Sequence, residues 1–267
     1  MASKRMEAAM NSNKPLFIPF ITAGDPSAEA TVELALMLEE AGASLLELGI
    51  PYSDPLADGP TIQAASKRAL ADGMTLEQAL QLVPLMREKG LTIPVIIFTY
   101  FNPLLQYGER RFTEEAAELG IDGVLVPDLP YEESEELGSL CRQKELVLIS
   151  LVAPTSRERM VKIAERAEGF LYCVSSLGVT GVRSELDPRV YDFLTTVREA
   201  SRIPTAVGFG ISTAEQVKVM NEHADGVVVG SALVAEIGAR AEALKQPATR
   251  AEALAEIKTF VSRLISS

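Results

Sequence analysis

Short apolar runs alternate with helical patterns along almost the whole chain. The runs are rich in Leu, Ile and Val and are apolar on both faces, which is typical of parallel strands covered on both sides. They occupy residues 16–22, 44–49, 94–99, 123–126, 146–150, 170–175, 204–208 and 226–229. Amphipathic helical spacing occurs in residues 28–40, 76–89, 113–119, 132–144, 156–167, 188–200 and 213–222. This pattern predicts a single (β/α)8 barrel domain over residues 1–267, with extra helices at both ends.

A short internal repeat supports the barrel. Residues 122–126 (DGVLV) and 225–229 (DGVVV) open the fourth and the eighth predicted strands, four units apart. Two similar half-barrels would explain this repeat. Chance agreement over five residues is the alternative.

Composition and charge narrow the classes of function. The 37 acidic and 25 basic residues give a formal net charge of −12, which disfavours binding to nucleic-acid phosphates. No segment reaches the roughly 20 apolar residues of a membrane-spanning helix, and the N-terminus lacks the apolar region of a signal peptide. We therefore expect a cytoplasmic protein with no membrane or nucleic-acid partner.

Histidine and cysteine are too scarce for the common metal sites. The chain has one histidine, His223, and two distant cysteines, Cys141 and Cys173. Neither CxxC nor HExxH occurs, so we expect no metal. His223 lies at the end of a predicted helix, where an imidazole complements the helix dipole, and we interpret it as structural. The sequence also lacks the GxxxxGK[ST] and GxGxxG patterns of nucleotide sites.

Glu47 is the most unusual residue in the predicted strands. Active sites of barrels lie at the C-terminal ends of the strands, which directs attention to the second strand. Alternation along that strand puts Glu47 on the same face as Leu45 and Gly49. A buried carboxyl has a raised pKa and can serve as a proton donor or shuttle near neutral pH. A structural glutamate bonded to a backbone amide is the alternative.

The loop that follows, residues 51–60 (PYSDPLADGP), contains two further carboxylates, Asp54 and Asp58. Its three prolines and one glycine indicate a constrained loop. A loop in this position can close over a ligand and place a second carboxylate opposite Glu47. Ordinary turn chemistry of Asp-Pro and Asp-Gly is the alternative for each aspartate.

Glycines after the last two strands indicate a phosphate site. Gly210 follows the seventh strand, and Gly230 and Ser231 follow the eighth at the start of a helix. Loops seven and eight, together with an extra helix N-terminus, form the usual phosphate site of this fold. Residues 178–181 could add amides and a hydroxyl, whereas we expect Arg183 to be an exposed loop residue. Glycines that only turn the chain are the alternative.

Residues for other catalytic mechanisms are missing, which points to acid–base chemistry. No lysine lies in a predicted strand, which disfavours a Schiff base, and histidine ligands for metal-assisted carbon–carbon cleavage are lacking. A phosphate-binding barrel with two carboxylates is therefore expected to catalyse proton transfer. Isomerisation and a lyase step driven by acid and base both fit this expectation.

Four segments together resemble the tryptophan synthase alpha subunit family. They are residues 19–26 (PFITAGDP), 46–60 (LELGIPYSDPLADGP), 177–181 (LGVTG) and 207–212 (VGFGIS), and the likeness extends from about residue 15 to about residue 264. The resemblance implies cleavage of indole-3-glycerol phosphate to indole and glyceraldehyde 3-phosphate, by a retro-aldol step without a cofactor in this chain. It also implies an alpha2beta2 assembly for L-tryptophan biosynthesis, in which the beta subunit carries pyridoxal phosphate and receives the indole.

The resemblance also implies roles for individual residues. Glu47 and Asp58 match the catalytic pair: Glu47 would shuttle a proton to indole C3, and Asp58 would accept the indole N–H. The matching substrate-binding residues are Phe20, Tyr100, Tyr172, Thr180, Gly181, Phe209, Gly210, Gly230 and Ser231, with Phe98 and Pro127 at pocket positions that vary within the family. The exposed candidates for contact with the beta subunit are Pro51, Asp54, Asn102 and Asp128 in the turn 128–130.

Other functions remain open from the sequence alone. A free-standing lyase would perform the same chemistry without a partner, and a subunit kept mainly for interaction would have vestigial chemistry. Intact Glu47 and Asp58 argue against the vestigial subunit, and the 51–60 loop argues against a different phosphosugar isomerase. We expect this loop and the 178–188 loop to flank one mouth and to close over the substrate.

Overall fold

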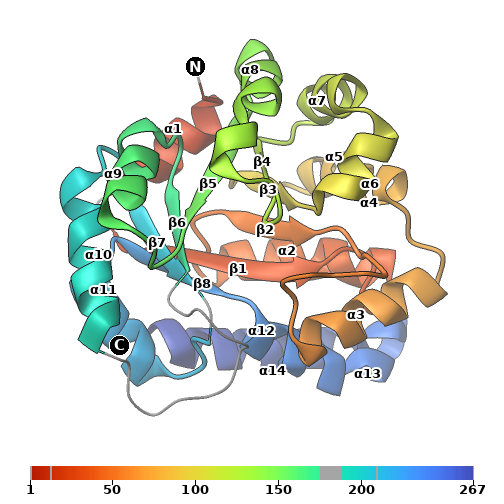
Figure 1. The fold of residues 1–267 in the computed structure, drawn as a ribbon. Coiled ribbons are helices and arrows are strands. Elements are labelled where there is room, and N and C mark those ends of the chain that lie inside the picture. The colour runs from red at the N-terminus through yellow and green to blue at the C-terminus, as the bar shows by residue number, and fades with distance from the viewer. Residues whose placement is uncertain (1, 13, 175–187, 209, 267) are drawn as a thin grey trace.

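The computed structural model describes residues 2–12, 14–174, 188–208 and 210–266, and its strands form a closed barrel (Figure 1). The strands follow one another around the barrel in chain order, and each pair of neighbours is parallel. Their bounds are β1 (Leu16–Thr22), β2 (Leu46–Gly49), β3 (Val95–Phe98), β4 (Gly123–Leu125), β5 (Val147–Val152), β6 (Leu171–Val174), β7 (Thr205–Gly208) and β8 (Gly226–Val229). All eight predicted strands are present, and the predicted (β/α)8 fold is confirmed.

Helices surround the barrel, and extra helices precede β1 and follow β8 as predicted (Figure 1). The helices of the first half are α1 (Lys4–Met10), α2 (Ala28–Glu40), α3 (Pro60–Ala71), α4 (Leu76–Leu80), α5 (Leu82–Glu88), α6 (Phe101–Tyr107) and α7 (Glu109–Glu118). Those of the second half are the 3₁₀ turn η1 (Tyr131–Glu133), α8 (Glu135–Gln143), α9 (Arg157–Arg166), α10 (Pro188–Ala200), α11 (Ala214–His223), α12 (Ser231–Ala239), α13 (Ala241–Lys245) and α14 (Pro247–Ile265).

The helix prediction fails in three places. The single helix expected over residues 76–89 is two helices, because Pro84 has no N–H to donate and its ring would clash with the carbonyl of Leu80. Helices α3 and α6 were not predicted at all. The first of these matters most for the site, because α3 begins directly after the 51–60 loop.

One apolar cluster fills the barrel interior, and Met6 of α1 belongs to it. Met6 is fully buried, so α1 closes the N-terminal end of the barrel. The other buried members of this cluster lie in the strands or one residue before them, namely Leu16, Ile18, Leu45, Ile96, Leu125, Val147, Ile149, Phe170, Tyr172, Ala206 and Val228. A cavity inside the barrel can therefore open only toward the C-terminal ends of the strands.

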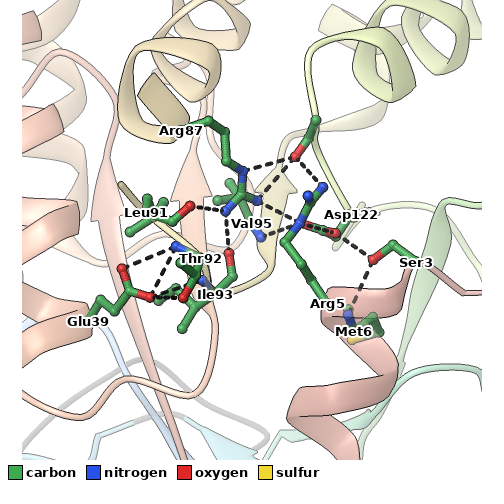
Figure 2. A network of polar contacts seen from close by, with 11 residues as sticks. Ser3, Arg5, Met6, Glu39, Arg87, Leu91, Thr92, Ile93, Val95 and Asp122 are labelled. Carbon is green, nitrogen blue, oxygen red and sulfur yellow. Dashed lines mark hydrogen bonds and ion pairs between the residues drawn. The ribbon is translucent and has the colours of Figure 1, made fainter. Parts of the chain in front are cut away.

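Asp122 holds the closed end together (Figure 2). Its carboxylate is fully buried and accepts hydrogen bonds from Arg5 Nε of α1 (2.9 Å), Arg87 Nη2 of α5 (2.8 Å) and the Val95 N–H of β3 (2.9 Å). Two guanidinium groups and an amide balance the buried charge, as a buried carboxylate requires. The N-terminal helix is thereby fixed to strands in the middle of the chain.

Asp225 repeats this arrangement half a barrel away. Its carboxylate accepts a hydrogen bond from the Thr205 N–H of β7 (2.9 Å) and pairs with Arg198 Nη2 of α10 (3.2 Å). Asp122 makes the corresponding contacts to the first residue of β3 and to an arginine of the preceding helix.

The glycines that follow the two aspartates are also equivalent. A Cβ atom on Gly123 would lie 2.5 Å from the Val147 carbonyl oxygen of β5, and one on Gly226 would lie 2.4 Å from the Leu16 carbonyl oxygen of β1. Real Cβ contacts are not this short, so only glycine fits at either position. The sequence repeat thus marks two equivalent places, where β4 meets β5 and where β8 meets β1.

Candidate active site

A cavity of about 420 Å³ lies at the C-terminal ends of the strands, where the sequence predicted the site. Its described lining residues are Phe20, Glu47, Ala57, Asp58, Gly59, Pro60, Thr61, Ile62, Phe98, Tyr172, Gly210, Ile211, Ser212, Val228, Gly230, Ser231, Ala232 and Ala235. This volume is in the range of small-molecule sites. Seven residues of the predicted site are brought together here, namely Phe20, Glu47, Asp58, Tyr172, Gly210, Gly230 and Ser231.

Glu47 projects from β2 into the cavity and is 1% exposed. Among the described residues, its Oε1 atom has no hydrogen-bond partner. Burial raises the pKa of Glu47 from 4.5 to about 8, because the charged form loses its contact with water. The group is therefore protonated at neutral pH. A buried carboxyl oxygen left without a partner among the described residues argues against the alternative of a structural, amide-bonded glutamate.

Tyr172 approaches the cavity from β6, on the other side of the barrel. Its ring packs over Gly208, where a Cβ atom would lie 2.3 Å from the tyrosine hydroxyl, so glycine makes room for the ring. Burial and the negative charge of Glu47 raise the pKa of Tyr172 well above its ordinary value. The hydroxyl consequently stays protonated near Glu47 throughout the neutral range.

Aromatic rings from β1 and β3 form an apolar wall beside Glu47. The ring of Phe20 meets that of Phe98 edge to face, with centroids 5.4 Å apart. Phe20 is opposite Glu47 in the strand register, and its ring covers Gly49, where a Cβ atom would lie 2.4 Å away. The wall offers the flat, apolar contact that an aromatic ring system needs.

Asp58 faces the cavity from the end of the 51–60 loop, one residue before the N-cap of α3. Burial raises its pKa, and a hydrogen bond with the Tyr100 hydroxyl opposes the rise. The same hydroxyl accepts a hydrogen bond from the Ala57 N–H (3.0 Å), while Gln63 Nε2 donates to the Asp58 carbonyl (2.8 Å). Tyr100 does not line the cavity itself, so the structure places it behind Asp58.

The part of the cavity lined by residues that follow β7 and β8 has the features of an anion site. Gly230 is the N-cap of α12 and makes no side-chain cap, so the first amides of that helix point toward the cavity that Ser231 lines. Gly210 has a φ of +82°, a conformation that other residues rarely adopt. No lysine, arginine or histidine is among the described lining residues.

The partner-facing predictions fall on the same end of the barrel. Asp54 and Asn102 are exposed, and Asn102 Nδ2 donates to the Tyr52 hydroxyl (3.0 Å). Asp128 is half-buried and caps α6 by accepting from the Phe101 N–H (2.8 Å). The prediction that Pro51 is exposed is wrong: this residue follows the apolar end of β2 by two positions and is buried like it.

Several predictions lie outside the described residues. They concern Thr180, Gly181, Arg183, Phe209 and all of the 178–188 loop except Pro188, which begins α10.

His223 ends α11 and packs against Tyr191, with centroids 4.5 Å apart, away from the cavity lining. This agrees with its interpretation as structural.

Sequence reasoning missed the wall that α3 contributes. Thr61 and Ile62 line the cavity from the first turn of this helix. A proline at the first helical position is a known signal for the start of a helix, and Pro60 occupies that position in α3.

The described residues contain no group of histidine, cysteine, aspartate and glutamate that could hold a metal ion. In the same part of the chain, no helix is both long and apolar enough to cross a membrane.

Comparison with known proteins gives one consistent result. A family model described as "Tryptophan synthase alpha chain" matches residues 6–262. The chain is 65% identical over 263 residues to a tryptophan synthase alpha chain of Halalkalibacterium halodurans, covering 98% of this chain and 99% of that one. A relative of the same description from Shouchella clausii is 64% identical, over 98% and 97% of the two chains.

Solved structures agree with the sequence relatives. A tryptophan synthase alpha chain from Legionella pneumophila superposes with a TM-score of 0.84 at 37% identity, covering 100% of both chains. A chain from the tryptophan synthase a2b2 complex of Pyrococcus furiosus superposes with a TM-score of 0.83 at 39% identity, over 95% of this chain and 98% of that one.

Proposed function

Because the chain belongs to the tryptophan synthase alpha chain family, we propose that Glu47 and Asp58 carry out the family's reaction in the barrel cavity. The reaction cleaves indole-3-glycerol phosphate to indole and glyceraldehyde 3-phosphate. The chain is thus a lyase of L-tryptophan biosynthesis that needs no cofactor of its own. It functions as the alpha subunit of an alpha2beta2 complex, with pyridoxal phosphate on the beta subunit.

The buried carboxyl of Glu47, which lines the cavity with its Oε1 atom unpartnered among the described residues, is the single observation that carries this proposal. Cleavage begins with a proton on indole C3, and a carboxyl whose pKa is about 8 holds that proton at neutral pH. As the carbon–carbon bond breaks, its electron pair returns to the indole ring and the glycerol hydroxyl becomes the aldehyde. The carboxylate of Glu47 then takes back the hydroxyl proton, so no net proton is consumed.

Asp58 supports the charged intermediate. Protonation of C3 leaves a positive charge on the indole ring, concentrated at its N–H. A carboxylate that accepts this N–H in a partly buried site stabilises the charge strongly. The Tyr100 hydroxyl holds the carboxylate of Asp58 in place from behind.

The substrate lies across the cavity in this proposal. The indole ring contacts Phe20 and Phe98, and the phosphate lies at the first turn of α12 with Gly210 and Gly230. Backbone amides bind the phosphate without a basic side chain among the described lining residues. Thr180, Gly181 and Phe209 complete the site, as the resemblance implies.

The partner and the location follow from the family. Asp54, Asn102 and Asp128 follow β2, β3 and β4 at the end of the barrel where the cavity lies, and we place the beta-subunit contact there. Weak cleavage by the isolated chain and activation by the beta subunit are expected, because contact at the mouth favours closure of the 51–60 loop. The biosynthetic role of the family supports the cytoplasmic location expected from the sequence.

The decisive experiment measures indole release with and without purified beta subunit. Glu47→Gln keeps the shape of the side chain but removes its proton, and should lower kcat by about 10²–10⁴-fold while a substrate analogue still binds. Glu165→Gln, which changes an exposed glutamate on α9, is the matched control. Turnover of Glu47→Gln within a few-fold of the native enzyme would reject Glu47 as the acid–base group. Equal rates with and without beta subunit would favour the free-standing lyase.

A further inference from the structure

The position of helix α3 determines the position of Asp58. Asp58 immediately precedes Gly59, the N-cap of α3, and Gln63 of the first turn donates to the Asp58 carbonyl (2.8 Å). A shift of α3 along or around its axis therefore moves Asp58 relative to Glu47. Something other than the 51–60 loop must fix the helix, because most of that loop is exposed or only half-buried.

Arg68, on the second half of α3, makes a contact that can fix the position of this helix. Its Nε donates to Asp25 Oδ1 (2.7 Å) and its Nη2 to Asp25 Oδ2 (2.9 Å). Asp25 is 2% exposed, and two parallel hydrogen bonds from a planar guanidinium fix direction as well as distance. This is a stronger constraint than a surface ion pair gives.

The Asp25 end of the pair is itself firmly anchored. Asp25 lies three residues after β1, the strand that carries Phe20. Its N–H donates to the Thr22 carbonyl (3.1 Å), and the neighbouring Gly24 N–H donates to Thr31 Oγ1 of α2 (3.0 Å). The pair therefore joins α3 to the end of a barrel strand.

Arg68 also touches the helix at the phosphate end. A Cβ atom on Gly238 of α12 would lie only 3.1 Å from Arg68 Nη2, so the guanidinium packs directly on the backbone of that helix. Helices α3 and α12 lie side by side (Figure 1). The first turn of each helix lines the cavity, one next to Asp58 and the other at Gly230.

We propose that the Asp25–Arg68 pair is a positioning device for catalysis, which holds α3 against β1 and α12 so that Asp58 faces Glu47. Asp25 and Arg68 do not line the cavity, and the proposal gives them no contact with a reacting atom. The inference rests on the catalytic role proposed for Asp58. A displacement of about 1 Å at a reacting group lowers the rate by about 100-fold, so a modest loosening of α3 should be measurable.

The test is a double-mutant cycle on kcat for indole release, measured in the complex with beta subunit. Arg68→Lys keeps the charge and loses the two-bond fork, and should lower kcat by about 10-fold with less change in KM. In an Asp58→Asn background the same substitution should have no further effect on kcat, because the carboxylate that the pair positions is already absent. Gly238→Ala, which pushes on the guanidinium from α12, serves as a second variant if Arg68→Lys folds poorly.

Lys67→Gln is the matched control. It removes an exposed positive charge from the same helix, one residue before Arg68, leaves both hydrogen bonds to Asp25 in place and should leave kcat unchanged. Equal losses from Arg68→Lys in both backgrounds, or a lower melting temperature with unchanged kcat, would overturn the proposal. Full activity of Asp58→Asn alone would instead refute the proposed role of Asp58, so the two failures are distinguishable.

Discussion

Replacing Glu47 by glutamine should make the protein more stable at neutral and alkaline pH while it removes activity. Glu47 has a pKa of about 8 in the folded protein, against 4.5 for its ordinary value. The folded state therefore holds a proton that the unfolded chain releases. As the pH rises from about 4.5 to about 8, this group makes the native protein progressively less stable relative to the unfolded chain.

The size of the effect follows from the two pKa values. Each pKa unit is worth about 1.4 kcal/mol, so the loss is about 3 kcal/mol at pH 7 and approaches about 5 kcal/mol above pH 9. It is close to zero below pH 4. Glutamine has the same shape and no titrating proton, so the variant lacks this dependence. The change is large beside a typical free energy of unfolding of about 5–15 kcal/mol.

Urea unfolding at pH 5, 7 and 8.5 measures the difference between the two proteins. The free energy of unfolding of Glu47→Gln, relative to the native chain, should increase by about 2 to 4 kcal/mol between pH 5 and pH 8.5. Other titrating groups affect both proteins and cancel in the comparison. A difference that stays constant with pH would refute the raised pKa, and with it the protonated acid on which the mechanism depends.

Three further outcomes follow from the site. Asp58→Asn should lower kcat by about 10²–10⁴-fold with little change in KM for the substrate, whereas a pure rise in KM would make Asp58 a binding residue. Gly230→Val should raise KM strongly by filling the space of the phosphate, and Arg183→Ala should matter much less; steady-state kinetics with the reverse ranking would contradict phosphate binding by amides. Asp54→Ala should reduce activation by the beta subunit more than the basal rate, and equal loss of both rates would contradict coupling through the 51–60 loop.

The barrel could be predicted from the sequence because its signals are local. Each strand is a short apolar run, and the helix over residues 28–40 was predicted with its observed bounds. Glu47 could be found for the same reason, since a carboxyl among leucines is visible without any knowledge of the fold. The family's loop sequence then identified Asp58.

The missed parts depend on contacts between distant residues. Nothing local marks Arg68, because an arginine on a helix is ordinary until its partner Asp25, far away in the sequence, is known. Helix α3 was overlooked because its first proline was read together with the loop before it. Burial of Pro51 is likewise not visible in the sequence, because the prolines and aspartates that follow it are typical of an exposed loop.

The matching aspartate–glycine pairs at 122–123 and 225–226 have a consequence for the history of the chain. They stand where strands one to four meet strands five to eight, once at β4 and β5 and once at β8 and β1. A barrel assembled from two copies of a four-strand segment has two junctions between the copies. Because the copies are alike, the same residues meet at both junctions. The equivalent contacts at Gly123 and Gly226 agree with duplication and fusion of a half-barrel, the explanation that competes with chance agreement of the two segments. A circularly permuted chain that began at β5 and ended at β4 would close with an unchanged pair of junctions.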